Sequence, residues 1–250
     1  MRNEEMKTSP PSQQVHLLAL AAHRDDVELT CGGTLAKAAR AGHRVGIVDL
    51  TRGESGTRGD AETRAAEAER AAQALGVPVR LNADLRDAYL ANDEPSRRRV
   101  VELIRITRPR VVILPFSIGR HPDHRIASEL GRDACYLAGL AKYDAPGEPH
   151  RPFKIVYSLA YREDPVKPSF VVDIRDCFEM KMRAVRCYAS QFEGAKAAGE
   201  IFPTGENLYE RIRMMSAHYG SLIRKPYGEP YFCYETVEVE DVLQLGVASM

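Results

Sequence analysis

The strongest constraint on the fold is an alternation, from residue 15 onward, of short runs that are apolar on both faces with longer amphipathic segments. Val15–Ala21 is such a run and precedes helical periodicity over Gly33–Ala41, and Arg44–Leu50 with Asp60–Leu75 repeats the pair. Runs of this kind, joined by helices, form parallel sheets that helices cover on both faces. The sequence therefore predicts an α/β fold with a Rossmann-like, mostly parallel sheet and helices on both faces. The further segments of the alternation are Val77–Leu81, Pro95–Thr107, Val111–Pro115 and His124–Leu140.

The helix from residue 60 is marked at both ends. Asp60 is a typical N-cap residue, Glu62 places an acid in the first turn, and Gly76 follows the last residue of the pattern. These signals predict that the helix begins just after Asp60 and ends just before Gly76.

The order of elements changes after the Pro- and Gly-rich loop at residues 145–152. Because Pro226 and Pro230 precede Tyr231–Val239, this β-like stretch is predicted as an edge or interface strand. The last third is thus an α+β extension of one domain, residues 15–250, and residues 1–14 form a flexible tail. The other elements predicted here are strands at Lys154–Ala160 and Ser169–Ile174 and helices at Asp176–Gln191 and Glu206–Tyr219.

Composition excludes several classes of partner. Lys and Arg balance Asp and Glu at 35 each, so no basic field attracts nucleic acid. No apolar run is long enough to cross a membrane, which predicts a soluble protein. The five cysteines are odd in number and lack CxxC spacing, which favours a reducing cytoplasm over a disulfide framework or a thiolate metal site.

Two clusters of metal-binding residue types each follow an apolar run. His23, Asp25 and Asp26 come after the first run, and His121 and His124 come after Val111–Pro115. Loops after parallel strands meet at the carboxyl edge of the sheet, where open α/β folds bind their ligands. His23, Asp26 and one of the two later histidines supply three ligands for a catalytic zinc ion and leave a fourth position for water.

The side chain of Asp25 diverges from that of its neighbour Asp26, so it is a candidate base for activating that water. The alternative is that Asp25 and Asp26 cap the following helix. A second alternative treats Gly32 and Gly33 as a phosphate-binding turn of a non-catalytic sugar- or nucleotide-binding module. A bound-metal assay separates these hypotheses, because only the hydrolase needs stoichiometric zinc.

The segments Ala22–Glu28 with Gly32-Gly33-Thr34, and His121-Pro122-Asp123-His124, resemble the AHPDD and HPDH motifs of the LmbE-like, or PIG-L, family of zinc-dependent N-acetylglucosamine deacetylases. The resemblance extends over nearly the whole chain from Val15. Four further segments are similar to the branch that contains the bacillithiol-biosynthesis deacetylases: Asp49–Gly59, Pro168–Ile174, Tyr188–Phe192 and Tyr227–Pro230.

This resemblance implies roles for the motif residues. His23, Asp26 and His124 would bind zinc or another divalent metal, and Asp25 would act as general base. His121 would stabilise the oxyanion or protonate the leaving amine, and Asp123 would orient a histidine. The resemblance also implies a homo-oligomer, for instance a hexamer.

The chain departs from the family pattern at Arg24, where the family has proline. The turn therefore lacks the stiffening that proline would give to His23 and Asp25, but it keeps the ligands and the base. Arg52, Glu54 and Arg58 lie in a Gly-rich loop on the same edge of the sheet, and Asp87 follows the third strand. These four are candidate substrate-binding residues, and the alternatives are a solvated loop and an ordinary turn aspartate.

The expected activity is removal of acetate from the N-acetyl group of a small glucosaminyl compound. The motifs do not fix the aglycone. Arg24, Arg52, Arg58 and Arg120 flank the predicted pocket, and guanidinium groups pair with carboxylates. This concentration of cations favours N-acetylglucosaminyl-malate, as in bacillithiol biosynthesis, over a glycoside of inositol.

Overall fold

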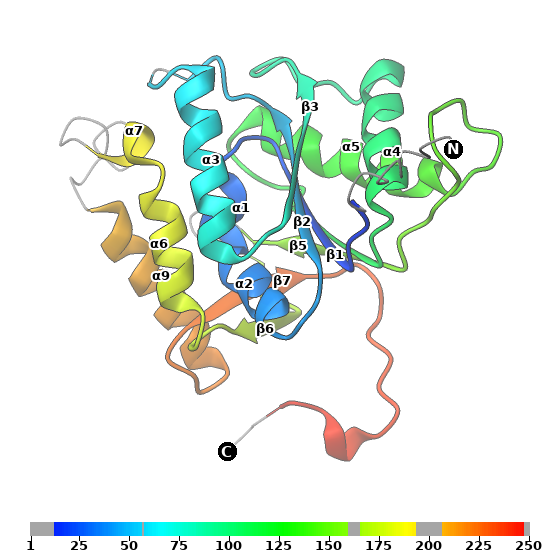
Figure 1. Ribbon diagram of the computed structural model, residues 1–250. Coiled ribbons are helices and arrows are strands. Elements are labelled where there is room, and N and C mark those ends of the chain that lie inside the picture. Colours follow the sequence, from blue (N-terminus) through cyan, green and yellow to red (C-terminus); the bar gives the residue numbers. More distant parts are fainter. Residues whose placement is uncertain (1–12, 57, 160–165, 194–206, 248–250) are drawn as a thin grey trace, which may run out of the picture.

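The computed structural model describes residues 13–56, 58–159, 166–193 and 207–247. Across these residues the strands form one seven-stranded sheet in the order β3-β2-β1-β4-β5-β7-β6 (Figure 1). Most of the predicted tail, residues 1–12, lies outside the described residues. The α/β prediction is confirmed.

The first five strands run parallel. β1 (Leu17–Ala21) lies between β2 (Val45–Thr51) and β4 (Val111–Pro115), with β3 (Val79–Leu85) outside β2 and β5 (Lys154–Ser158) outside β4. All residues of β2 are buried, as expected for a strand with helices on both sides.

Helices cover both faces of the sheet, as predicted. α4 (Glu94–Thr107) and α5 (Pro122–Ala138) bury their apolar stripes against one face. α2 (Gly32–Arg40), α3 (Ala61–Leu75) and α6 (Phe178–Arg186) cover the other face, and Figure 1 shows the two layers on opposite sides of the strands.

The predicted ends of α3 are confirmed. The side chain of Asp60 accepts a hydrogen bond from Thr63 N, so it caps the helix. Gly76 ends it in the left-handed conformation at φ +73°. Both signals are local in sequence, so no tertiary information was needed to place them.

The predicted edge strand Tyr231–Val239 is wrong in its bounds and its place. β7 (Gly228–Phe232) lies between β5 and β6 (Phe170–Asp173) and runs antiparallel to both. Proline lacks a backbone N–H and is tolerated here because Pro230 lies at the point where the pairing of β7 with β5 ends. It pairs with Val171 of β6, and its carbonyl accepts a hydrogen bond from Leu159 N.

The single helix predicted over Asp176–Gln191 is two helices. α6 ends at Arg186, and α7 (Ala189–Phe192) begins after Tyr188, whose side chain is fully buried. The helix breaks because Tyr188 turns into the core between them. The last long helix, α9 (Leu208–Leu222), packs on the outer end of the sheet against β6 and β7.

Within the described residues, no helix is both long and apolar enough to cross a bilayer. The five cysteines are all unpaired.

Candidate metal centre and active site

The candidate site lies where the connections of the sheet change direction. β1 and β4 are neighbours, but the chain continues from β1 to β2 on one side and from β4 to β5 on the other. Such a switch point leaves a crevice at the carboxyl edge. Residues 23–26, the first motif turn, follow β1. Residues 119–124, the second motif turn, follow β4 and begin α5.

The ligand atoms of His23, Asp26 and His124 lie within 4.8 Å of one another. Asp26 stands between the imidazoles, with Oδ2 3.3 Å from Nδ1 of His23 and Oδ1 3.2 Å from Nε2 of His124. The backbone N–H of His23 donates to Asp26 Oδ2, which orients the carboxylate. Two imidazoles and one carboxylate are a donor set of the kind that catalytic zinc takes.

The other ring nitrogen of His23 faces two more carboxylates. Nε2 lies 3.1 Å from Oδ1 of Asp87 and 3.5 Å from Oδ2 of Asp123. The Asp123 carboxylate is almost fully buried and accepts a hydrogen bond from Ala88 N. His23, His121 and Asp123 form a second group close enough to bind a metal ion. The crevice therefore offers two overlapping ligand sets that share His23.

The carboxylates shift the pKa values of the cluster strongly. Burial lowers the pKa of His23, but Asp26, Asp123 and Asp87 outweigh it and raise this pKa to about 12. Burial raises the pKa of Asp26, yet the charges of His124 and His23 hold it well below its usual range. Asp26 therefore stays ionised, and the carboxylates together stabilise positive charge at His23. A divalent cation supplies that positive charge without protons. The donors thus fit a metal ion.

Asp25 lies beside the cluster. It is at the N-cap position of the short helix α1 (Asp26–Thr30), but its side chain makes no capping hydrogen bond. Its Oδ1 instead lies 3.6 Å from Nη2 of Arg64. Burial, followed by the charge of Asp26, raises the pKa of Asp25. The capping interpretation is wrong for this residue.

Arg64 is a site residue that the sequence reasoning missed. It is only 4% exposed, on the face of α3 that buries Ala68 and Leu75, and its Nη1 donates to Gly53 O at 2.6 Å. A Cβ at Gly53 would lie 2.1 Å from that nitrogen, so only glycine admits the guanidinium. The sequence did contain a signal for this role, because Arg64 lies on the apolar stripe of an alanine-rich helix, where a cation is unusual.

Hydrogen bonds from other elements of the fold hold the backbone of the first motif turn in place. The carbonyl of Arg24 accepts hydrogen bonds from Arg80 Nη2 and from the hydroxyl of Tyr188. The Arg24 side chain donates to Ala61 O at 2.6 Å, at the start of α3. These contacts fix the turn at Arg24, where the sequence departs from the pattern it resembles, and they direct the Arg24 side chain to α3.

Arg80 belongs to a buried charge network. Its Nε and Nη2 bind both oxygens of Asp49, at 2.8 and 2.9 Å, and its Nη1 donates to Glu28 Oε1 at 2.6 Å. The hydroxyl of Tyr188 also lies 3.0 Å from Glu28 Oε1, so its single proton is shared between this oxygen and the Arg24 carbonyl. Burial raises the pKa of Glu28 to about 7 although Arg80 opposes this shift. We name Arg80, Asp49, Glu28 and Tyr188 the anchor network.

Glu229 occupies the N-terminus of α2. Its carboxylate accepts hydrogen bonds from Gly33 N, Thr34 N and Thr34 Oγ1, at 2.9, 2.7 and 2.6 Å. Lys181 Nζ pairs with it at 2.7 Å, and neither side chain is exposed. A Cβ at Gly33 would lie 3.0 Å from Glu229 Oε1, so this glycine serves close packing. The interpretation of Gly32-Gly33 as a phosphate turn is wrong.

The second motif turn is more open. His121 is exposed, stacks on His124 with ring centroids 4.9 Å apart, and accepts a hydrogen bond from Asp123 N at its Nδ1. Outside it, Arg125 Nη1 donates to the carbonyls of Gly119 and Arg120 at 2.9 and 3.3 Å.

The four candidate substrate-binding residues do not all lie at the cluster. Asp87 contacts His23 of the candidate metal-binding cluster, and Glu54 accepts a hydrogen bond from Asp87 N at 2.8 Å. Arg52 points away, to Asp84 at 2.7 Å. Arg58 contacts the carbonyl of Glu193 at 3.5 Å. The structure therefore brings together the acidic pair and directs Arg52 elsewhere.

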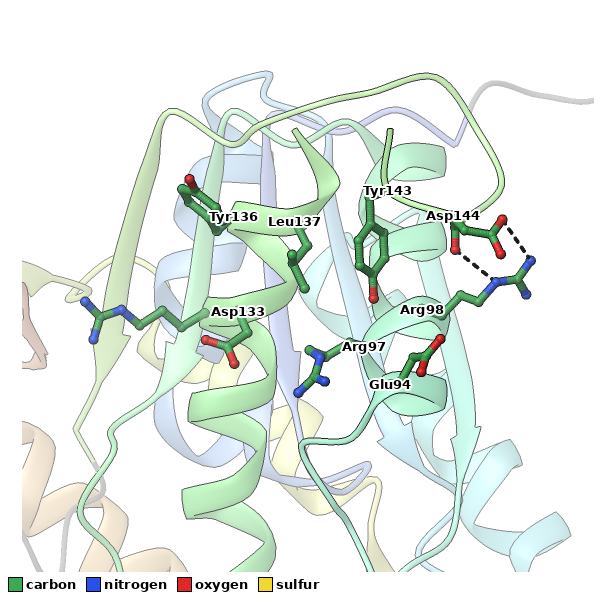
Figure 2. A pocket seen from close by; sticks show the side chains of 9 residues that line it. Glu94, Arg97, Arg98, Asp133, Tyr136, Leu137, Tyr143 and Asp144 are labelled. Atoms are coloured by element: carbon green, nitrogen blue, oxygen red, sulfur yellow. Dashed lines mark hydrogen bonds and ion pairs between the residues drawn. The ribbon is translucent and has the colours of Figure 1, made fainter. Parts of the chain in front are cut away.

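A small cavity adjoins Asp26 and His124. It measures about 60 Å³, and Phe116 and Ile118 line it together with Thr30 of α1. A larger hollow of about 760 Å³ lies between α4 and α5 (Figure 2). Arg97 and Arg98 line it from α4, Asp133 and Tyr136 line it from α5, and Asp144 pairs with Arg98. None of the motif residues lines the larger hollow.

Comparison with known proteins identifies the family. Residues 18–135 match the model of the PIG-L family, described as GlcNAc-PI de-N-acetylase. The chain is 30% identical to the diacetylchitobiose deacetylase of Thermococcus kodakarensis over 90% of its own length and 85% of that protein. The chain belongs to the PIG-L, or LmbE-like, family of de-N-acetylases. It is accordingly a hydrolytic N-deacetylase.

Two solved structures share the fold. The conserved protein TT1542 of Thermus thermophilus superposes with a TM-score of 0.81 and 37% identity, covering 91% of this chain and 98% of that one. GalB of Pseudomonas putida, a 4-carboxy-2-hydroxymuconate hydratase, superposes with a TM-score of 0.76 over 91% and 99% of the two chains. At 21% identity GalB shows the fold alone, so the reaction must be argued from the site.

Proposed function

We propose that this protein hydrolyses the N-acetyl group of a small N-acetylglucosaminyl compound and that its metal is zinc. The observation that carries the proposal is the convergence of His23, Asp26 and His124 at the switch point, with Asp25 beside them. Zinc, when bound, polarises an amide carbonyl and acidifies water.

Different residues of the site accept and donate the protons of the reaction. Asp25 accepts the proton of the attacking water, for which its raised pKa suits it. Arg64 keeps the Asp25 carboxylate oriented through the contact at 3.6 Å. His121 stabilises the oxyanion or protonates the leaving amine, and Asp123 orients His23 by its contact with Nε2.

The small cavity beside Asp26 and His124 suits the acetyl methyl group. One water molecule needs about 10–15 Å³ of such a cavity, so a volume of about 60 Å³ holds a few non-hydrogen atoms but no long acyl chain. Phe116 and Ile118 make that end of the site apolar. The enzyme therefore selects acetyl over longer acyl groups.

The aglycone is the finer part of the proposal. We retain N-acetylglucosaminyl-malate in bacillithiol biosynthesis. Arg24 and Arg52 bind Ala61 O and Asp84, so Arg58 and Arg120, which the sequence places in the Gly-rich loop after β2 and in the second motif turn, are the cations proposed to pair with the malate carboxylates. The likeness to diacetylchitobiose deacetylase favours a second candidate, an N-acetylated disaccharide. The five free cysteines support a cytoplasmic location, and the family resemblance supports a homo-oligomer such as a hexamer.

Acetate release from N-acetylglucosaminides of malate, inositol and a second sugar tests this function. We expect release that a chelator abolishes and that zinc restores. Preference for malate over inositol would support the anionic aglycone, and loss of that preference in Arg58→Ala would assign it. Equal efficiency with both glycosides would contradict the malate proposal. Absence of acetate release from every member, with metal bound, would contradict the deacetylase itself.

A further inference from the structure

The C-terminal segment, residues 234–247, leaves the body of the protein. Every residue in it is exposed, and Figure 1 shows it running clear of the sheet and helices after β7. Among the described residues, the hydrogen bonds of this segment beyond Tyr234 are internal and lie around the single turn Val242–Gln244. We call residues 235–247 the arm. An extended arm of this length reaches about 40 Å.

The arm is both apolar and acidic. Its exposed aliphatic side chains include Leu243 at 89%, Val242 at 76% and Val247 at 68%. Single exposed aliphatic residues are ordinary on protein surfaces, but a run of them on one projecting segment marks an interaction site. The arm also carries four carboxylates and no Lys or Arg, at Glu235, Glu238, Glu240 and Asp241.

The same chain presents a surface with the opposite character. Arg108, Arg110 and Arg151 line a hollow of about 310 Å³ together with His16 and His150, and no Asp or Glu of the described part of the chain lines it. We call this surface the basic hollow. Because the chain has equal numbers of acidic and basic residues, arm and hollow are local excesses of opposite sign.

Aromatic rings interleave with these cations. Phe153 is 76% exposed and lies under the Arg110 guanidinium, 5.4 Å from its ring centroid. Arg151 lies 4.4 Å from the ring centroid of Tyr136, which is 60% exposed. Alternating acids and aliphatic groups on the arm match alternating cations and rings on the hollow. This match of charge and apolar surface in one sequence points to a second copy as the partner.

We propose that the arm of one protein chain docks in the basic hollow of a second copy, with the arm carboxylates paired to Arg108, Arg110 and Arg151 and the arm valines and leucines packed on Phe153. A head-to-tail contact of this kind joins different surfaces of the two copies, so it generates a ring or a chain of subunits rather than a simple isologous pair. The proposal concerns assembly and is independent of the reaction.

Charge reversal tests it by sedimentation or light scattering of the full chain. Wild type is expected to sediment as a multimer at micromolar concentration. Glu238→Lys with Glu240→Lys reverses the arm, and Arg110→Glu with Arg151→Glu reverses the hollow. Each pair should weaken assembly about tenfold or more. Glu69→Lys with Glu129→Lys, exposed and outside both surfaces, is the matched control and should assemble as wild type does.

Combining the two charge reversals tests whether the arm pairs with the basic hollow. The chain that carries both reversals should regain assembly, and an equimolar mixture of arm-reversed and hollow-reversed chains should associate where each alone does not. Recovery in the combined variant also shows that the single reversals had not merely unfolded the protein. A monomeric wild type, or an arm-reversed chain that assembles as tightly as wild type, would overturn the proposal. Failure of both recombinations would overturn the assignment of the hollow.

Discussion

The two motif turns reach the same crevice but are held by different means. The first turn, residues 23–26, rests on the anchor network, in which the side chain of Arg80 is 7% exposed and that of Glu28 is fully buried. The second turn, residues 119–124, is supported on its outside by the exposed Arg125. Buried charge pairs are costly to break, whereas exposed contacts contribute little. The first turn is therefore anchored by buried charge pairs, and the exposed outer part of the second turn is held by weaker contacts.

Removal of the base should have the largest effect. In Asp25→Asn the three ligands of the metal set remain, so the protein should keep its metal while kcat falls about 10²- to 10⁴-fold. Acetate release and metal content, measured on the same preparation, check this. Loss of metal from Asp25→Asn together with its retention in His124→Ala would mean that the roles have been assigned the wrong way round.

The second largest effect belongs to the anchor network. Arg80→Met leaves the carboxylates of Asp49 and Glu28 buried without their cation, which should lower the free energy of unfolding by about 3–5 kcal/mol. The matched control is Arg125→Met in the second turn, which should cost less than about 1 kcal/mol because that arginine is exposed. Urea unfolding of both variants makes the comparison. Equal losses would contradict the difference between the turns.

A milder change addresses the same turn. Tyr188→Phe removes one of the two donors to the Arg24 carbonyl and should cost about 1–1.5 kcal/mol of folding stability. If the tyrosine acts by positioning the turn, kcat should fall several-fold while the Michaelis constant stays unchanged. A variant that loses stability but keeps full kcat would limit Tyr188 to a packing role.

The smallest effect is expected at Arg24. Because the anchor network already holds its carbonyl, Arg24→Pro should keep the metal and change thermal stability by no more than about 0.5–1 kcal/mol. Melting temperature and metal content measure this. A large gain in turnover would show that the wild-type turn is loose after all, and a raised Michaelis constant for an anionic glycoside would assign Arg24 to substrate binding.

Local signals placed much of this fold correctly. The strand Val111–Pro115 matches the predicted bounds, and Asp60 and Gly76 mark the ends of α3 as expected. The convergence of the motif turns also followed from sequence, because loops after parallel strands share one edge. These features depend on near neighbours or on a general rule of topology.

The anchor network was beyond the sequence because its members pair across long separations. Arg80 lies 52 residues from Glu28, and Tyr188 lies 160 residues from it, so no local pattern joins them. Glu229 likewise reaches Gly33 across 196 residues and replaces the phosphate that the glycines suggested. Charged residues on apolar stripes were the available signal, but a stripe does not identify the partner.

The central claim is that one metal site at this crevice removes acetate from an N-acetylglucosaminyl compound. The most direct measurement is metal content and acetate release for wild type and for Asp26→Ala, whose carboxylate stands between the two imidazoles. We predict stoichiometric zinc and acetate release in wild type, and loss of both in the variant. Acetate release that persists in metal-free Asp26→Ala, or a metal-loaded wild type that releases no acetate and instead hydrates an unsaturated acid, would contradict the account.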